Sequence, residues 1–403
     1  MKVTKEYTED KIVIFGAGKI GRSFIGQLFS RGGYEVVFID VYQPVIDELN
    51  RRRNYNVVIK GDEESVITVQ NVRGVFGGDA AKVASEITTA RIVAVSVGLN
   101  GLKSIMPLLA NGLVMRYETE KAFPLDIIIA ENLRNAAEFM FQELKKLLPE
   151  GYPLEERVGL IETSIGKMVP ITLKKDMNED ILQVFAEPYN TLILDKLAFK
   201  NPIPEIAGLA PKENMNVWVD RKLFIHNLGH ATAAYLGNQA HPNAVFLYEV
   251  LADSQLKDTV RKTMLQAADI LLKKYPDEFT LELLTEHIDD LLNRFQNKAL
   301  GDTVFRVGCD LQRKLGAKDR LAGAIRLARE LKLPYHLILM ALVAGCHFNA
   351  TDEDGKTLSS DREFVKIYSK GIKAVLISVC GFDEIADYDL ISKAFAIDNL
   401  LKV

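Results

Sequence analysis

A lysine, an asparagine and a histidine stand close together in the segment RKLFIHNLGH, residues 221–230. Lys222, Asn227 and His230 form the pattern K-x4-N-x2-H in an otherwise mostly apolar run. At about 100° per residue of α-helix, Asn227 lies about 140° from Lys222, and His230 falls between them at about 80°. The three side chains can therefore face one side of a helix, which we predict over residues 213–236.

These residue types supply what hydride removal from an alcohol requires: a base for the hydroxyl proton and donors for the developing alkoxide. A lysine can be the base when burial and nearby positive charge lower its pKa toward ~7–8. The amide can then stabilise the oxyanion, and the histidine can orient a substrate hydroxyl. His226, on the same arc, either adds polar lining or packs in the core. The alternative is a helix with a solvated polar face, which is the better interpretation of any one of these residues alone.

The segment FGAGKIG, residues 15–21, has the G-x-G-x-x-G spacing of a dinucleotide-binding turn. The first glycine allows a tight turn, the second lets a pyrophosphate approach the backbone, and the third lets helix and strand pack closely. The N-terminus of the following helix offers free N–H groups and a positive dipole end to phosphates. The predicted cofactor-binding residues of this turn are Gly16, Ala17, Gly18, Lys19, Ile20 and Gly21.

The turn has the context that makes such a motif specific. It follows an apolar strand candidate at 11–15 and opens a helix at 19–31, and the next strand candidate, 34–40, ends at Asp40. Asp40 can accept hydrogen bonds from ribose hydroxyls and would repel a 2′-phosphate, so we predict NAD rather than NADP. A glycine turn that binds nothing would not explain the whole unit. Gly98, after a further strand, either borders the cofactor or is an ordinary loop glycine.

The first 200 residues alternate β-rich runs with helical stretches, which predicts a doubly wound parallel sheet covered by helices on both faces. Further strand candidates lie at 91–97, 125–130, 158–163 and 181–187, and a β-hairpin insertion is expected from 55–60 and 65–76. The Pro- and Gly-rich segment 201–211 is typical of a linker. Helical periods follow at 213–236, 244–253, 255–274, 279–296, 319–331, 335–346, 360–379 and 385–401. We therefore predict an α/β chain with a Rossmann-type domain, 1–200, and a mostly α-helical domain, 201–403.

Composition narrows the class of protein. The 403 residues carry a formal net charge of −4 and an ordinary globular mixture, which does not favour a nucleic-acid or membrane partner. The charged N-terminus MKVTKEYTEDK does not resemble a signal peptide. The three cysteines lack metal-ligand spacing and are expected to be reduced core thiols, and the histidines form no zinc-like cluster. We expect a cytoplasmic protein without a metal, a monomer or small homo-oligomer, acting on a small molecule.

The sequence resembles the polyol-specific long-chain dehydrogenases, the mannitol dehydrogenase family, over essentially the whole chain. The segments that carry the resemblance are IVIFGAGKIGRSFIGQLF, AEN (130–132), DRKLFIHNLGHATAAYLG (220–237), RFQNKALGDTVFRVG (294–308) and RKLGAKDRL (313–321). The most specific element is K-x4-N-x2-H. The resemblance implies a metal-free mechanism with Lys222 as general base, and it is greatest to the members that act on mannitol 1-phosphate.

The resemblance also implies further site residues. Asn132 matches the family's second oxyanion donor and would border the nicotinamide, and Arg306 and Lys314 match its substrate-contacting arginine and lysine. In SIGKMVP (164–170) the chain departs from the family, because Gly166 replaces an aspartate and Lys167 an arginine.

This change makes the pocket more positive and suits an anionic substrate. In RKLGAKDR, one or two of Arg313, Lys314, Lys318 and Arg320 either grip a phosphate or belong to a solvated basic loop.

The implied reaction is mannitol 1-phosphate + NAD+ to fructose 6-phosphate + NADH. Two alternatives remain. The substrate can be a free polyol or a hexuronate, or the chain can be a non-catalytic NAD-binding sensor, because fold alone does not establish catalysis. A sensor has no need of a base, so the Lys222–Asn227–His230 set favours an enzyme.

Overall fold

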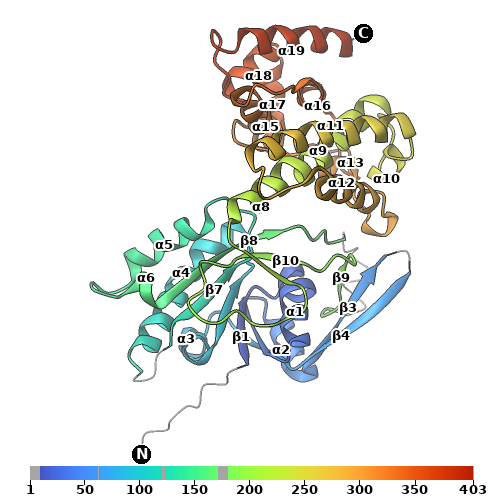
Figure 1. Cartoon of the computed structure of the whole chain (residues 1–403). Helices are drawn as coiled ribbons and strands as arrows, with labels where there is room; N and C mark the ends of the chain where they lie inside the picture. Colours follow the sequence, from blue (N-terminus) through green and yellow to red (C-terminus); the bar gives the residue numbers. More distant parts are fainter. Residues whose placement is uncertain (1–9, 62, 120–122, 171–179, 403) are drawn as a thin grey trace, which may run out of the picture. The chain divides into compact units, whose positions relative to one another are not determined.

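The computed structural model describes residues 10–61, 63–119, 123–170 and 180–402 (Figure 1). Two compact units divide the chain, Met1–Val219 and Asp220–Val403, here called the N-terminal and the C-terminal unit. The predicted combination of a Rossmann-type sheet and a mostly helical part is confirmed. Residues 1–9, on which the expected absence of a signal peptide largely rests, lie outside the described ranges.

The N-terminal unit is built on a sheet with the strand order β11-β10-β8-β7-β6-β1-β2-β5. Its strands are β1 Lys11–Phe15, β2 Glu35–Asp40, β5 Val72–Phe76, β6 Ile92–Val95, β7 Leu125–Ile129, β8 Val158–Ile165, β10 Leu192–Asp195 and β11 Leu209–Lys212. β1 pairs in parallel with both β2 and β6, so the strand order reverses at β1. Ligands of open α/β sheets bind beyond the carboxyl ends of the strands at such a switch point.

The predicted hairpin insertion is right in its first part and wrong in its second. β3 (Asn54–Lys60) and β4 (Glu64–Gln70) pair antiparallel, and β9 (Val184–Ala186) completes this small sheet beside β3. The next residues leave the hairpin because Asn71 takes a φ of 55° and redirects the chain. β5 then pairs in parallel with β2 and belongs to the main sheet. At the far edge, β11 (Leu209–Lys212) overlaps the end of the predicted linker 201–211, so this segment joins the main sheet.

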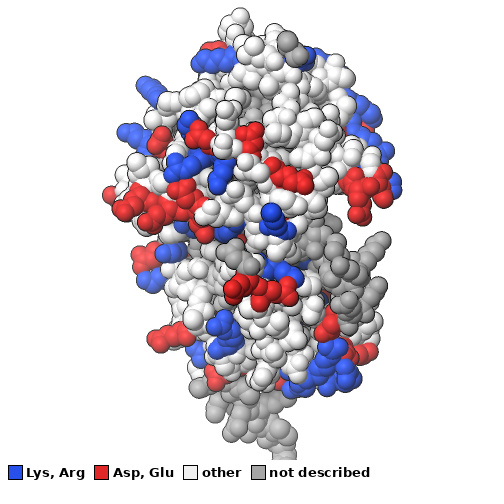
Figure 2. All heavy atoms as spheres, turned by 90° about the vertical axis from the view of Figure 1, so that its right-hand side faces the viewer, with Lys and Arg blue, Asp and Glu red and all other residues white. Residues whose placement is uncertain are grey.

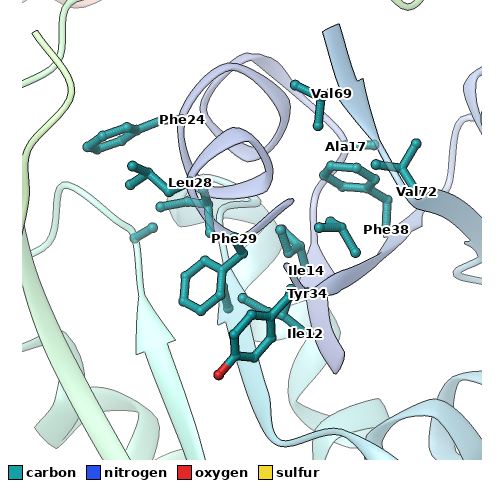
Figure 3. Close-up of a cluster of buried hydrophobic side chains, with 14 of the residues drawn as sticks. Ile12, Ile14, Ala17, Phe24, Leu28, Phe29, Tyr34, Phe38, Val69 and Val72 are labelled. Atoms are coloured by element: carbon teal, nitrogen blue, oxygen red, sulfur yellow. The ribbon is translucent and has the colours of Figure 1, made fainter. Parts of the chain in front are cut away.

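Both faces of the main sheet are buried, which explains the continuous apolar runs. The helices of this unit are the π-helical turn η1 Gly21–Gly26, α1 Gln27–Arg31, α2 Gln43–Arg52, α3 Ala80–Thr89, α4 Leu99–Tyr117, α5 Ala136–Leu147 and α6 Leu154–Arg157. Ile12 and Ile14 of β1 belong to one apolar cluster, whereas Val13 and Phe15 belong to the other. Figure 3 shows the first cluster, in which Phe24, Leu28 and Phe29 from η1 and α1 lie over the strands. This packing holds the helix that follows the glycine-rich turn against the sheet.

The C-terminal unit is helical, as predicted, with α9 at its centre. Its helices, with the one that leads into it, are α8 Met215–Arg221, π-helical η2 Lys222–Asn227, α9 Leu228–Ala240, α10 Leu247–Val250, α11 Ser254–Lys274, α12 Leu281–Phe295, η3 Lys298–Leu300, α13 Val304–Gly308, α14 Leu311–Lys314, α15 Ala322–Glu330, α16 His336–Cys346, α17 Ser359–Tyr368, α18 Ile372–Ser378 and α19 Tyr388–Leu401. α9 packs against α10, α11, α13 and α16. The helix predicted over 360–379 is interrupted at Gly371, where φ is 97°.

Acidic and basic side chains are interspersed over the face shown in Figure 2, in keeping with the small net charge of −4. Among the described residues, none of the helices combines the length and the apolar character needed to cross a membrane. Cys309, Cys346 and Cys380 are free thiols, of which Cys346 and Cys380 are buried. Cys309 is partly exposed, so the expectation that all three lie in the core is wrong for this residue.

Candidate active site

Two of the three motif glycines are required because a side chain would collide with the main chain of the turn, whereas the third leaves open space beside the backbone. Gly16 has a φ of 97°, and a Cβ there would lie 2.4 Å from the carbonyl oxygen of Ser96. A Cβ on Gly21 would lie 2.0 Å from the carbonyl oxygen of Gly16. A Cβ on Gly18, in contrast, would meet nothing within 4 Å. The turn thus presents open backbone at the position where the motif lets a pyrophosphate approach.

Asp40 is fixed beside this turn at the end of β2. Its Oδ2 accepts the N–H of Ala17 at 2.7 Å, and its Oδ1 accepts the N–H of Tyr42 at 2.9 Å. An ionised carboxylate has about four acceptor positions, so these two bonds leave capacity for ribose hydroxyls. Lys19 is exposed, with its Nζ 3.4 Å from the carbonyl oxygen of Pro170, and Ile20 packs against the core.

Sequence reasoning missed Arg22, whose buried side chain donates a hydrogen bond to the main chain of the turn. The residue is buried, and its Nε donates to the carbonyl oxygen of Ala17 at 2.7 Å while Nη1 donates to that of Leu182 at 2.7 Å. Burial lowers the pKa of Arg22 from its usual value, although a guanidinium stays charged at neutral pH. A buried arginine after the third motif glycine therefore acts on the main chain of the turn.

Gly98 and Asn132 reach the same sheet edge from the next two strands. Gly98 follows β6, has a φ of 76° and begins α4, and Asn132 follows β7 and is exposed. The Gly98 N–H donates to Oε1 of Glu131 at 2.8 Å, which ties the two loops together. Since β1, β6 and β7 are parallel neighbours, the structure brings the predicted cofactor-binding residues of the N-terminal unit to one edge.

Lys222 and Asn227 are the first and last residues of the π-helical turn η2. A π-helix bonds residue i to i+5 and turns less per residue than an α-helix. The two side chains therefore come closer to one face than the 140° expected for an α-helix. Such turns occur frequently at functional sites. The helix predicted to end at residue 236 runs further, because α9 continues to Ala240. Within it, the missing Cβ of Gly237 leaves room for the side chain of Val250.

Lys222 has the electrostatic character of a base. Burial, and secondly the charge of Arg320, lower its pKa from the usual 10.5 to about 8. Arg320 is buried over the same turn, with its Nη1 donating to the carbonyl oxygen of Asn227 at 3.3 Å. Its Nε is paired with Asp319 at 2.8 Å.

His230 is held between an aromatic ring and a carboxylate. Its ring stacks on Phe295 at 4.5 Å with an interplanar angle of 7°. Nε2 of His230 lies 3.2 Å from Oδ2 of Asp302, within ion-pair distance but not aligned as a hydrogen bond. Burial, and then the charges of Arg306 and Lys314, lower the pKa of His230 well below its usual value, so the imidazole is neutral. Buried His226, 5.7 Å from Phe295, is likewise neutral and packs in the core.

Three predicted substrate-binding cations gather around His230. Arg306 is partly exposed and paired with Asp302, whereas Lys314 is buried and donates to the carbonyl oxygen of Val307 at 2.7 Å. Burial, and then the charge of Arg320, lower the pKa of Lys314 to about 8. The charges of Arg306, Lys314 and Arg320 all act on His230. Sequence reasoning missed Asp302, although its place four residues before Arg306 is the spacing of a helical ion pair.

The fourth predicted substrate-binding cation, Lys167, belongs to the N-terminal unit. It is buried, and its Nζ donates to Glu187 O at 3.2 Å, Tyr189 O at 2.7 Å and Asn190 Oδ1 at 2.9 Å. These bonds commit its ammonium to the loop. A Cβ on Gly166 would make only ordinary contact with the Tyr189 ring at 3.5 Å, so packing does not require glycine there. Within the described ranges, no three His, Cys, Asp or Glu side chains converge as metal ligands would.

Comparison with known families places the chain. The dinucleotide-type sheet and the helical unit both match models of one oxidoreductase family. Residues 10–208 match the mannitol dehydrogenase Rossmann domain, and residues 214–399 match the mannitol dehydrogenase C-terminal domain. The chain therefore belongs to the mannitol dehydrogenase family, whose members are dehydrogenases acting on CH–OH groups.

Solved structures show the same fold. A D-sorbitol dehydrogenase in substrate-free form matches with a TM-score of 0.78 and 17% sequence identity, covering 98% of this chain and 94% of that one. The Pseudomonas fluorescens mannitol 2-dehydrogenase in a ternary complex with NAD and D-mannitol matches with a TM-score of 0.73 and 15% identity, covering 98% and 91%. At these identities the likeness establishes the fold, and the substrate has to be argued from the site.

Proposed function

We propose that the chain is an NAD-dependent dehydrogenase of a polyol phosphate, with Lys222 as general base and no metal ion in the mechanism. The observation that carries this proposal is the lysine itself. Its pKa of about 8 lies in the range of an effective base, and it shares one π-helical turn with an amide, Asn227. A solvated helix face, the alternative interpretation, would leave a lysine with an ordinary pKa.

The N-terminal unit fits NAD. NAD supplies the acceptor for hydride when it is bound. Open backbone at Gly18 and the N–H groups at the start of η1 suit the pyrophosphate, and Asp40 suits the adenosine ribose. The same carboxylate would repel a 2′-phosphate, which supports NAD over NADP.

The C-terminal unit supplies the proton chemistry. Neutral Lys222 takes the hydroxyl proton as the neighbouring C–H bond gives up its hydride, and the resulting ammonium returns the proton in the reverse direction. Asn227 donates to the developing oxyanion, and Asn132 at the end of β7 is the second donor in this proposal. His230, being neutral, orients a substrate hydroxyl through a hydrogen bond.

The finer assignment is a mannitol-1-phosphate 5-dehydrogenase, which interconverts mannitol 1-phosphate and fructose 6-phosphate. Support comes from the gathering of Arg306, Lys314 and Arg320 around His230, because arginine and lysine bind phosphate through charge-assisted hydrogen bonds. Gly166 supports an anionic substrate too, since it replaces a carboxylate of the family pattern.

A free polyol is the second candidate, and one observation favours it. Asp302 pairs with Arg306 and offsets its charge, so the site holds less free positive charge than its residues suggest. A hexuronate, which carries its own carboxylate, is a third possibility of the same reaction type. A non-catalytic NAD sensor remains the rival from another class.

A substrate panel read by NADH absorbance tests the proposal. We expect kcat/KM for mannitol 1-phosphate to exceed that for mannitol and sorbitol at least about 100-fold, because a desolvated ion pair is worth roughly 3 kcal/mol. Fructose 6-phosphate, fructose and a hexuronate are assayed in the reducing direction.

Lys314→Met should lower the preference for the phosphate, whereas Lys366→Met, at an exposed lysine on α17, should leave it unchanged. A preference for the free sugar would favour the second candidate. If no compound of the panel is turned over, the sensor gains support.

A further inference from the structure

Asp302 is a buried carboxylate that lies between two proposed substrate-binding side chains. It is only 4% exposed, and its oxygens lie against the guanidinium of Arg306 and against Nε2 of His230, the latter at 3.2 Å. Nothing in the proposed reaction has so far used this carboxylate. A buried charge of this kind calls for an explanation.

The segment that carries Asp302 is held rigidly. The Asp302 carbonyl oxygen accepts the N–H of Leu247 at 2.9 Å, and the next residue, Thr303, bridges to Phe246 and caps α13 through a bond from the Arg306 N–H at 3.1 Å. The carboxylate therefore projects from a fixed piece of main chain, so it can impose a direction on its neighbours.

Stability alone does not account for the carboxylate. Taking a carboxylate out of water costs several kcal/mol, which is offset only when its lone pairs meet well-aligned donors. One oxygen of Asp302 pairs with Arg306, and the other faces Nε2 of His230 without an aligned hydrogen bond. Both neighbours of this buried carboxylate are proposed substrate-binding side chains, so its position indicates a role in the site.

Asp302 faces one of the two ring nitrogens of His230, Nε2. The neutral imidazole has one N–H and one acceptor nitrogen. Burial, and then the charges of Arg306, Lys314, Arg320 and Arg294, lower the pKa of the ring and keep it neutral. An ionised carboxylate only accepts, so its position beside Nε2 favours the tautomer with the proton on that nitrogen. In that tautomer Nδ1 is the acceptor, and the stack on Phe295 fixes the plane in which it accepts.

We propose that Asp302 is a positioning residue that couples His230 to Arg306, with one oxygen selecting the Nε2–H tautomer of His230 and the other directing the guanidinium. This inference rests on the proposed function. The orientation of the substrate hydroxyl by Nδ1 and the grip on the distant end of the substrate are then set by a single carboxylate. Arg306 is held in one direction before substrate arrives.

Asp302→Asn tests the coupling, because a carboxamide of the same shape has one accepting and one donating side and cannot serve both neighbours. We expect kcat to fall about 10-fold and KM to rise about 10-fold, whereas Arg306→Ala should raise KM with little change in kcat. The double variant should raise KM no further than Arg306→Ala alone. Asp289→Asn, which removes a partly exposed carboxylate paired with Arg261, is the matched control and should change neither constant.

A spectroscopic measurement tests the same idea without any substrate. In protein labelled with 15N-histidine, the His230 signals, assigned with His230→Gln, should show the Nε2–H form in the unaltered chain and a tautomer mixture in Asp302→Asn. An unchanged tautomer, or kinetic constants within twofold of the parent, would overturn the coupling. So would a loss of activity that merely follows a lower Tm and weaker NADH binding, since Asp302 would then be structural. A failure of the substrate panel leaves the tautomer experiment intact, so the two proposals fail separately.

Discussion

The glycine-rich turn leads into the π-helical turn η1, and the Lys222–Asn227 segment is the π-helical turn η2. The two regions differ in which part of the chain, main chain or side chains, supplies the chemistry. At the turn, the main chain presents the chemistry, and side chains are removed to let a ligand approach. In the Lys222 segment, side chains present the chemistry, and their surroundings adjust its charge. Backbone chemistry depends on neighbours in the sequence, whereas side-chain chemistry depends on groups brought from elsewhere in the chain.

Distances and pKa values make the contrast concrete. Gly21 is required by the carbonyl oxygen of Gly16, which belongs to the same motif. Lys222 owes its pKa of about 8 to burial and to Arg320, which lies far along the chain. The need for glycine at position 21 can be predicted from the spacing of glycines in the sequence. The lowered pKa of Lys222 cannot, because it depends on contacts that form only when the C-terminal unit folds.

Removing the base should have the largest effect and should separate the two regions cleanly. In Lys222→Ala we expect kcat to fall by about 10³-fold, within the usual range for loss of a positioned general base. NADH affinity, measured by fluorescence titration, should stay within about twofold because the dinucleotide residues are untouched. Steady-state rates with the best substrate of the panel are the measurement. Full turnover by this variant would place the base elsewhere.

Two glycine variants test whether the turn serves the ligand or the fold. Gly18→Val should weaken NAD binding by about 100-fold and leave thermal unfolding unchanged, because its side chain would enter open space. Gly21→Ala should lower the free energy of unfolding by about 1–3 kcal/mol, because its Cβ would lie 2.0 Å from the Gly16 carbonyl oxygen. Calorimetric titration and thermal unfolding give both quantities. Equal destabilisation by the two variants would show that the opening at Gly18 is not a ligand site.

A variant of Asp40 tests the side chain beside the turn that is proposed to bind the adenosine ribose. Asp40→Ser should weaken NAD binding about 10-fold and relax the discrimination against NADP, because the charge that would repel a 2′-phosphate is gone. The Ala17 N–H also loses its acceptor. Asp47→Ser, at a carboxylate of α2 that accepts from Gln43, is the control. An unchanged NAD to NADP ratio would contradict the role given to Asp40.

The smallest expected effect is a shift in the pH profile, which tests whether the charge of Arg320 lowers the pKa of Lys222. A lysine acting as base must be neutral, so alcohol oxidation should rise with pH through about 8 and level off above it, while ketone reduction should fall. Arg320→Gln removes a positive charge, so the pKa of Lys222 should rise. The ascending limb of kcat should then move upward by roughly half a unit, about threefold in rate at pH 7.5. An unmoved limb would mean that Arg320 does not tune the base.

The parts that sequence reasoning predicted are those whose causes are local. β1, β2, β6 and β7 read as continuous apolar runs because both sheet faces are buried. β5 was predicted as part of the hairpin because the segment 65–76 has no sequence signal for the turn at Asn71 or for pairing with β2.

The site divides in the same way. The glycine motif, Asp40 and the Lys–Asn–His pattern are visible in the sequence, and they supported the same family that the domain models identify. Phe295 carries no such pattern, and Asp302 shows only its four-residue spacing to Arg306, because the importance of both lies in contacts with His230 across the fold. The π-helical turns were missed as well, since their apolar positions still fit a helical period.

The π-helical turn also decides how base and amide tolerate changes in chain length. One extra residue is accommodated between Lys222 and Asn227 compared with an α-helical turn. Deleting one residue of that interval would let the helix close into a regular α-helix, with Lys222 and Asn227 four residues apart and about 40° from each other. Keeping the five-residue spacing in a regular α-helix would instead turn the two side chains about 140° apart. The alignment of base and amide therefore depends on the helical geometry at this point as much as on the spacing in the sequence.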